Sequence, residues 1–265
     1  MIPIQILRVL STIRQFDVPA LLMGGQACVL YGAAEYSRDV DLAVLATDDA
    51  LPRLTDALQA LQATVIAVPS FEQHYLTRGH AVHFNVPPDA DLGAVPPLRV
   101  DIMSLMRGVA PFEELWERRT TIALVDSSSP AEILVDLLSL SDLVQAKKTQ
   151  RDKDWPMLRR LVDASYASAR DAAVSDEQIE FWLAELRSPE FLAEVVAQYP
   201  VQAARSLRPA VIAARCDGAM AEELASEQAL EMAADRAYWE PLRRELEALR
   251  HAARRSAGGD QTRNE

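Results

Sequence analysis

The chain has 265 residues, of which 49% are hydrophobic and 25% are charged, and its formal net charge at pH 7 is −12. These values are ordinary for a globular protein with one large domain or two modest ones. The acidity argues against broad, non-specific affinity for nucleic acid, because such affinity depends on Lys and Arg that neutralise phosphates. No apolar run approaches the roughly 18 residues of a membrane span. The first residues also lack the pattern of a secretion signal, so we expect a cytoplasmic protein with no membrane partner.

The first part of the chain mixes helical and strand patterns. Residues 2–16 predict an amphipathic helix, and its inward residues are Ile6, Leu7, Val9, Leu10 and Ile13. A short buried strand is expected at 20–23, followed by two glycines and a helical segment at 26–31. Further strands are expected at 40–45, 64–68, 81–86 and 98–103, with a helix at 51–61.

Beyond about residue 125 we expect helices alone. The run Ser129-Pro130-Ala131-Glu132 combines a capping box with Pro at the first helical position, which predicts a helix to about residue 148. Similar signals at 175–178 and 188–190 predict two more helices, and Ala-rich helices continue to about 255. The predicted class is α+β. A small mixed sheet flanked by helices occupies 1–125, an all-helical domain 126–255 and a disordered tail 256–265.

Asp39 and Asp41 lie two residues apart at the start of the strand expected at 40–45. Because strand side chains alternate, both carboxylates project from one face while apolar residues pack the other. Asp101 is likewise a polar residue on an otherwise apolar strand, and the three carboxylates converge if the two strands are neighbours. Carboxylates grouped in this way can hold Mg²⁺ ions that activate an attacking hydroxyl and neutralise a leaving pyrophosphate. Asp101 is also a candidate acceptor for the hydroxyl proton.

Gly24 and Gly25 separate a predicted strand from a predicted helix. Glycine is scarce, and three of the nine glycines fall within nine residues, which indicates a backbone constraint. Backbone N–H groups at such a turn can cradle phosphate at the start of a helix. Each feature taken alone also has a structural interpretation. Paired glycines can form a plain tight turn, and an Asp-x-Asp pair is more often a turn or strand-edge feature.

Together these motifs resemble a known superfamily. The pattern Gly-Gly-x-Ala, about a dozen residues, Ser/Thr-x-Asp-x-Asp and then a strand Asp is similar to the DNA polymerase β-type nucleotidyltransferases. It is most similar to their minimal nucleotidyltransferase branch, which includes type IV toxin–antitoxin toxins, and it covers about residues 20–103. The resemblance implies a nucleotidyltransferase domain at 1–125 in which three carboxylates bind metal and catalyse, namely Asp39, Asp41 and Asp101. It implies nucleotide contacts from Gly24, Gly25 and Ser37.

The resemblance extends into the predicted helical domain. The run 147–154, Lys-Lys-Thr-Gln-Arg-Asp-Lys-Asp, is similar to a Lys…Arg-x-Lys-Asp segment of the toxin-like relatives. It implies that Lys147 reaches the nucleotide phosphates, where a lysine acts as a compact positive charge. The alternative is a solvated basic helix end, which is the better interpretation for Lys148 and Arg151. One departure is Glu35, at a position where many relatives carry Arg; Arg38 is a neighbouring residue that can compensate by binding nucleotide.

The implied activity is a metal-dependent nucleotidyl transfer. With Mg²⁺ or Mn²⁺ bound, the protein would move a nucleoside monophosphate from an NTP such as ATP to an acceptor hydroxyl by a two-metal mechanism. The sequence leaves the acceptor open among RNA, a protein and a small molecule. The toxin branch further implies a toxin role with a cognate antitoxin as partner. The alternative is a catalytically degenerate module of the same fold that binds nucleotide or a partner, an interpretation that Glu35 keeps open.

Several other residues carry possible chemistry. His83 is expected on the strand beside Asp101, where a hydrogen-bonded structural role is favoured over contact with nucleotide or acceptor. Trp116 and Trp155 are expected to pack in the interior rather than to stack on bases. Both cysteines, Cys28 and Cys216, are expected to be buried thiols because they have no metal or redox spacing. Arginines of the C-terminal helices are expected on solvated faces, with docking of an acceptor as the alternative: Arg205, Arg208, Arg215, Arg236, Arg243, Arg244 and Arg250.

Overall fold

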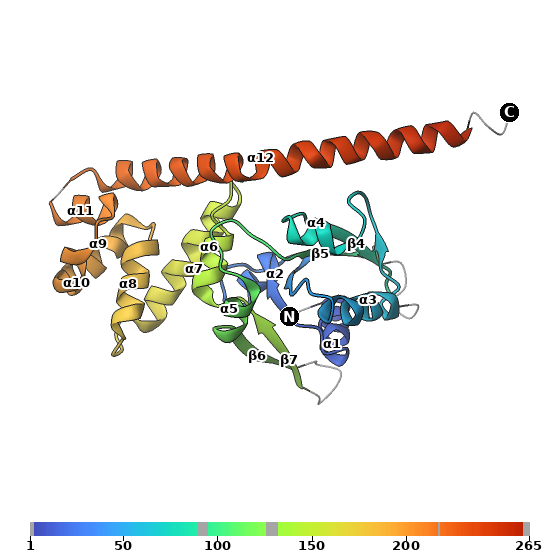
Figure 1. The fold of residues 1–265 in the computed structure, drawn as a ribbon. Coiled ribbons are helices and arrows are strands. Elements are labelled where there is room, and N and C mark those ends of the chain that lie inside the picture. Colours follow the sequence, from blue (N-terminus) through green and yellow to red (C-terminus); the bar gives the residue numbers. More distant parts are fainter. Residues whose placement is uncertain (1–2, 90–94, 126–131, 217, 262–265) are drawn as a thin grey trace. The chain divides into compact units, whose positions relative to one another are not determined.

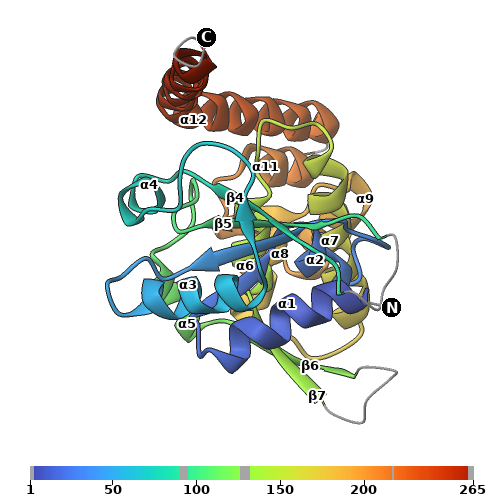
Figure 2. The same ribbon diagram turned by 90° about the vertical axis from the view of Figure 1, so that its right-hand side faces the viewer.

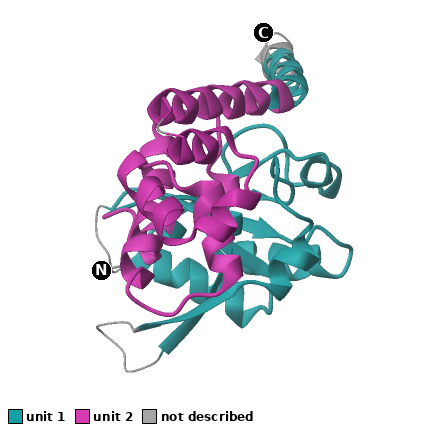
Figure 3. Ribbon diagram, turned by 90° about the vertical axis from the view of Figure 1, so that its left-hand side faces the viewer, with its two compact units in different colours: residues 1–27, 36–142, 239–265 teal, residues 28–35, 143–238 magenta. Residues whose placement is uncertain are grey.

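A computed structural model describes residues 3–89, 95–125, 132–216 and 218–261. The chain divides into two compact units (Figure 3). Residues 1–27, 36–142 and 239–265 belong to the first unit, and residues 28–35 and 143–238 belong to the second. Within the described ranges, no helix is both long enough and apolar enough to cross a membrane.

A seven-stranded mixed sheet forms the centre of the first unit, with the strand order β3-β4-β5-β2-β1-β7-β6. The strands are β1 (Ala20–Met23), β2 (Val40–Val44), β3 (Thr64–Val65), β4 (Val82–Val86), β5 (Leu98–Met103), β6 (Thr120–Val125) and β7 (Glu132–Leu137). β2 pairs antiparallel with β1 and parallel with β5, so it occupies the middle of the sheet. This mixed sheet, combined with helices, confirms the predicted α+β class.

Five short helices accompany the sheet among the described residues up to 142. They are α1 (Ile4–Gln15), α2 (Gly24–Leu30), α3 (Ala50–Ala60), α4 (Gln73–Thr77) and α5 (Phe112–Glu117). Helix α1 packs against α3 and β7, and Figure 2 shows α1 and α3 on the same side of the sheet. All five residues predicted to face inward on α1 are buried. The helical periodicity of the sequence therefore identifies the packed face correctly.

The second unit consists of helices (Figure 1). They are α7 (Asp154–Ala169), α8 (Asp176–Glu185), α9 (Pro189–Gln198), α10 (Pro200–Arg205), α11 (Pro209–Arg215), most of α6 (Leu140–Ala146) and the first part of α12 (Met220–Gln261). The predicted cap of α8 is confirmed, because the backbone N–H of Gln178 donates to Ser175 Oγ at 3.2 Å. Trp182 is fully buried and meets Tyr166 edge to face, and Trp155 is buried as predicted.

The helix predicted from residue 129 to residue 148 is wrong in its first half. Glu132–Leu137 is strand β7, which pairs antiparallel with β6 and parallel with β1, and helix α6 begins only at Leu140. The first three of the four residues that carry the capping signal, 129–131, lie outside the described part of the chain. Strand formation is favoured here because Val135 and Leu137 are buried in the sheet while the residue between them is not. A strand therefore lies within 126–255, where the sequence predicts helices alone.

Three smaller predictions also differ from the structure. Lys148, expected at a solvated helix end, is buried and pairs with Glu185 at 2.8 Å. Helix α12 continues to Gln261, so the first part of the segment 256–265, expected to be a disordered tail, is helical. Cys28 is buried as predicted, but Cys216 is exposed because it follows the last turn of α11 at the surface. The arginines expected on solvated helix faces are exposed, with the exception of Arg208.

Candidate active site

Three polar side chains form one row across the centre of the sheet. Asp41 of β2 is in direct register with Asp101 of the parallel strand β5, and Asp101 is in direct register with His83 of β4. Directly paired residues on adjacent strands project from the same face. The strands that carry the carboxylates are therefore neighbours, as the convergence of their side chains requires.

Asp101 is held by two basic side chains. Arg99 donates from Nε and Nη2 to the two carboxylate oxygens at 2.7 and 3.0 Å, and His83 Nδ1 lies 2.8 Å from Oδ1. Since an ionised carboxylate only accepts, this contact requires a proton on Nδ1 of His83, and Arg99 Nη2, 3.1 Å from the same nitrogen, then donates to Asp101 alone. Burial alone would raise the pKa of Asp101, but the hydrogen bonds from His83 and Arg99 outweigh it and hold the pKa below its ordinary value. Asp101 is therefore ionised at neutral pH.

Arg99 places a positive charge near three carboxylates, Asp39, Asp41 and Asp101, which are called the acidic row below. It lies two residues before Asp101 on β5, so both side chains project from the same face of the strand. Its hydrogen bond to Asp101 raises its pKa, and the charges of Asp39 and Asp41 raise it further. Asp39 and Asp41 therefore lie close enough to Arg99 for all three carboxylates to share one electrostatic environment.

The two glycines allow the backbone at 24–25 to lie close to the side chains of Asp41 and Ser37. Gly24 has a φ of +65°, and a Cβ built on it would lie 1.8 Å from Asp41 Oδ2. A Cβ on Gly25 would lie 2.4 Å from Ser37 Oγ. Values below 3.0 Å are essentially never seen, so any larger residue would displace these side chains. The predicted backbone constraint thus has a specific cause, which is contact of the chain at 24–25 with Asp41 and Ser37.

Gln26 supports the segment that precedes β2. Its side chain is 2% exposed, and Nε2 donates to the backbone oxygen of Ser37 at 2.8 Å. Ser37 Oγ in turn lies 3.4 Å from the backbone oxygen of Asp39. Arg38, the other predicted nucleotide contact in this segment, is exposed. The segment that leads to Asp39 is therefore anchored through its backbone to the start of α2.

Lys147 belongs to the second unit and is not open to solvent. Its Nζ lies 3.2 Å from Asp154 Oδ1, and both side chains are buried. Asp154 also accepts hydrogen bonds from Thr149 and Arg151. Burial alone would raise the pKa of Asp154, but the charge of Lys147 and the other contacts hold it below its ordinary value. The lysine predicted to bind phosphate thus has a structural ion pair within its own unit.

The acidic row supplies oxygen ligands but is not a preformed metal cage. Among the residues that the structure describes, no group of three or more His, Cys, Asp or Glu side chains is placed to hold a metal ion. Both oxygens of Asp101 are engaged by Arg99, whereas Asp39 and Asp41 lie two residues apart at the start of β2. Carboxylates are the ligands that Mg²⁺ and Mn²⁺ prefer, so the Asp39–Asp41 pair suits such an ion.

Two residues of this site are absent from the set predicted from the sequence. One is Arg99, although its position two residues before Asp101 on a strand places it on the same face and is a signal that could have found it. The other is Gln26. Its role in holding Ser37 depends on the path of the loop, which no local pattern in the sequence predicts.

The solved structures include proteins with a similar fold. No protein-family model matches the chain, and no curated protein matches it. A crystal structure of an antigenic nucleotidyltransferase-like protein from Paracoccidioides brasiliensis is similar with 16% sequence identity and a TM-score of 0.42. The likeness covers 74% of this chain and 86% of that chain. A likeness at this TM-score carries no functional argument, so the function has to be inferred from the residues of the site.

Proposed function

We propose that the protein is a metal-dependent nucleotidyltransferase that transfers a nucleoside monophosphate from an NTP to an acceptor hydroxyl. The observation that supports this proposal is the direct register of Asp41 with Asp101 on neighbouring parallel strands. Asp39 precedes Asp41 by two residues, and Gly24 leaves room for no side chain against Asp41. Carboxylates brought together beside a glycine turn suit a reaction in which negative charge on phosphate must be neutralised.

In this proposal Asp39 and Asp41 hold Mg²⁺ or Mn²⁺, with Asp101 as the third carboxylate. The bound ions would withdraw charge from the phosphate oxygens and the leaving pyrophosphate. Asp101 accepts the proton of the acceptor hydroxyl, and the fork of Arg99 fixes the orientation of its two oxygens. His83 donates to the same carboxylate and keeps it ionised. Gly25 lets the backbone approach Ser37, which we assign to the triphosphate with Gly24 and Arg38.

The test is nucleotidyl transfer by the purified chain. The protein would be mixed with Mg²⁺ or Mn²⁺, each of four NTPs labelled at the α-phosphate, and RNA, protein or small-molecule fractions of a cell extract. We expect a labelled product with the wild type and none with Asp41→Asn. The matched control is Asp49→Asn, because Asp49 is an exposed carboxylate of the same unit that makes no capping hydrogen bond. Equal labelling by the wild type and Asp41→Asn would refute the proposal.

Binding measurements separate catalysis from recognition. Calorimetry with a non-hydrolysable NTP should show binding that requires Mg²⁺ and is lost in Asp41→Asn. Metal-dependent binding without any transfer would identify a non-catalytic nucleotide-binding module instead. The absence of metal-dependent binding would exclude both functions.

We further propose, from the resemblance of the motifs alone, that the transferase acts as a toxin opposed by an antitoxin. Expression of the chain by itself should then arrest growth, and Asp39→Ala should abolish the arrest. Growth arrest that persists in Asp39→Ala would contradict a toxin role that depends on nucleotidyl transfer. Unchanged growth with the wild type would remove the toxin role but leave the transferase proposal standing.

A further inference from the structure

A cavity of about 620 Å³ lies within the second unit, beside α7, the start of α9 and the first part of α12. Its charged lining residues are Arg159, Arg160, Arg187, Asp152 and Asp163. Trp155 and Leu224 contribute apolar walls, and Gln228 contributes an amide. Sites for small molecules commonly have volumes of roughly 300–1,000 Å³, so this cavity is large enough for a ligand of that kind.

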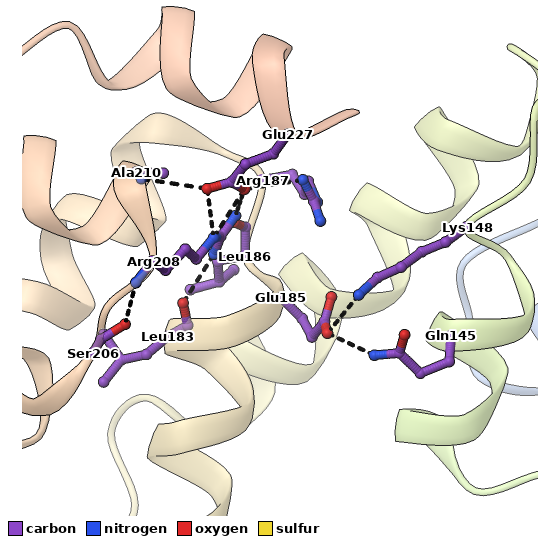
Figure 4. Close-up of polar contacts among 10 residues, drawn as sticks. All are labelled: Gln145, Lys148, Leu183, Glu185, Leu186, Arg187, Ser206, Arg208, Ala210 and Glu227. Carbon is purple, nitrogen blue, oxygen red and sulfur yellow. Dashed lines mark hydrogen bonds and ion pairs between the residues drawn. The ribbon is translucent and has the colours of Figure 1, made fainter. Parts of the chain in front are cut away.

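Arg187 is the buried cation of this cavity. Its side chain is only 8% exposed. Nη1 donates to Glu227 Oε2 at 3.2 Å (Figure 4). Nε, in contrast, is buried and has no hydrogen-bond partner among the residues that the structure describes. A buried N–H without an acceptor is costly, so Nε of this lining residue requires an acceptor that the described residues do not supply.

Other arginines of the chain show what this edge of a guanidinium binds. Arg99 holds Asp101 through Nε and Nη2, and Arg118 holds Asp142 through the same two atoms at 2.7 and 2.8 Å. In Arg187 the corresponding Nε has no such anion among the described residues. A planar fork of donors matches two oxygens of a carboxylate or a phosphate.

The carboxylates around Arg187 do not supply the acceptor that Nε lacks. Glu227 is shared, because it also accepts from Arg208 Nη2 at 2.9 Å (Figure 4). Burial lowers the pKa of Arg187, and the charge of Arg208 lowers it further, while Glu185, Glu227 and Glu231 act in the opposite direction. None of these three carboxylates accepts a hydrogen bond from Nε. The guanidinium also lies over the ring of Trp155, 5.4 Å from its centroid. Arg187 is therefore a buried cation that Glu227 and an indole face compensate in part, and its Nε has no acceptor among the described residues.

We propose that this cavity binds a phosphate monoester, with the phosphate on Arg187 and the organic group beside Trp155. A phosphate is favoured over a carboxylate because three arginines line the cavity, and a dianion with three terminal oxygens can contact more than one of them. Of the acidic lining residues, Asp152 is exposed. Asp163 Oδ2 lies 3.6 Å from Arg159 and accepts from Ser188. Its Oδ1 is buried without a donor among the described residues, and burial raises the pKa of this carboxyl group, which reduces its repulsion of an anion. The site is independent of the proposed transferase activity.

Phenyl phosphate is a suitable probe, with benzoate and phenol as comparisons. Titration calorimetry of the full chain should show one site for phenyl phosphate, weaker binding of benzoate by about ten-fold or more, and no binding of phenol. An NMR signal locates the ligand, because the indole N–H of Trp155 donates to the backbone oxygen of Thr149 at 2.9 Å. This signal, assigned by its loss in Trp155→Phe, should shift with phenyl phosphate and not with phenol.

Two variants test the role of the arginines. Arg187→Lys keeps the charge but removes the Nε donor, so binding of phenyl phosphate should weaken by about ten-fold or more. Arg160→Ala changes an exposed lining residue and should weaken binding several-fold without affecting the fold. Arg215→Ala is the matched control, because Arg215 is exposed in the same unit and lies outside the cavity lining.

Three results would overturn the proposal. They are no binding of phenyl phosphate at millimolar concentration, equal affinity in the wild type and Arg160→Ala, and tighter binding of benzoate than of phenyl phosphate. Should Arg187→Lys fail to fold, Arg160→Ala and the indole signal of Trp155 decide the question. Nucleotidyl transfer enters none of these measurements, so failure here leaves the proposed function untouched.

Discussion

Replacement of Gly24 by alanine should damage both the fold and the acidic row. Gly24 has a φ of +65°, a conformation that costs an L-residue with a Cβ about 1–2 kcal/mol. The new Cβ would also lie 1.8 Å from Asp41 Oδ2, where ordinary contact begins at 3.4 Å. Asp41 must therefore move by roughly 1.5 Å, and an off-rotamer side chain costs about 0.5–1.5 kcal/mol more. We expect Gly24→Ala to lower the free energy of unfolding by about 2–3 kcal/mol.

Gly108→Ala is the matched control for this prediction. Gly108 has nearly the same φ, +69°, but a Cβ there meets nothing within 4 Å. Gly108→Ala should therefore lower the free energy of unfolding by the backbone strain alone, about 1–2 kcal/mol, as measured by urea denaturation. In the transferase assay Gly24→Ala should lose about 100-fold in rate because Asp41 is displaced, and Gly108→Ala should keep the wild-type rate. Equal stability and equal rates in the two variants would refute the view that Gly24 is needed to accommodate Asp41.

Three further predictions concern the charged groups. The pKa of Asp101 is lower in the folded state than in the unfolded state, where it is about 4. Its ionised carboxylate therefore stabilises the fold above about pH 4, and this stabilisation decreases as the pH falls. Asp101→Asn should therefore reduce the loss of unfolding free energy between about pH 5 and pH 2, measured by urea denaturation; an unchanged pH dependence would contradict this. Arg99→Ala removes the fork that lowers the pKa of Asp101, so the acid limb of the pH–rate profile should move to higher pH, whereas an unmoved limb would exclude Asp101 as the titrating group. Lys147→Met leaves Asp154 buried with a weaker partner and should destabilise the fold by about 3 kcal/mol, and loss of NTP affinity without loss of stability would instead favour a direct role for Lys147.

The central strands of the sheet are largely predictable from the sequence. The expected strands at 20–23 and 98–103 have the same bounds as β1 and β5, because short apolar runs bounded by glycine or polar residues leave little choice. The alternation of buried and less buried residues on β5 also identifies Asp101 as a residue on the face opposite the packed one. The pairing of β2 with β5 joins segments about 60 residues apart, so only the structure establishes that the two strands are adjacent.

Strand β7 shows where local signals fail. The capping pattern at 129–132 favours a helix, and nothing in 132–137 excludes one. The strand is selected by its partners, since β6 pairs with it along its whole length and β1 pairs with it at Leu137. The same limitation applies to the C-terminal helix. Its residues from 239 onward belong to the compact unit formed by the first half of the chain, an association that no pattern within the helix indicates.

Arg99 connects the fold to the proposed chemistry. Three carboxylates on one row repel each other, and such a row is costly to assemble without a cation. Arg99 supplies that cation from the same strand face as Asp101 and also senses the charges of Asp39 and Asp41. Under the proposed function, a metal ion bound to these carboxylates would compete with the positive charge of Arg99, so its affinity would be lowered by the residue that stabilises the carboxylates without metal. The proposal therefore predicts a weakly held ion that arrives with the nucleotide, whose triphosphate would supply the remaining oxygen ligands.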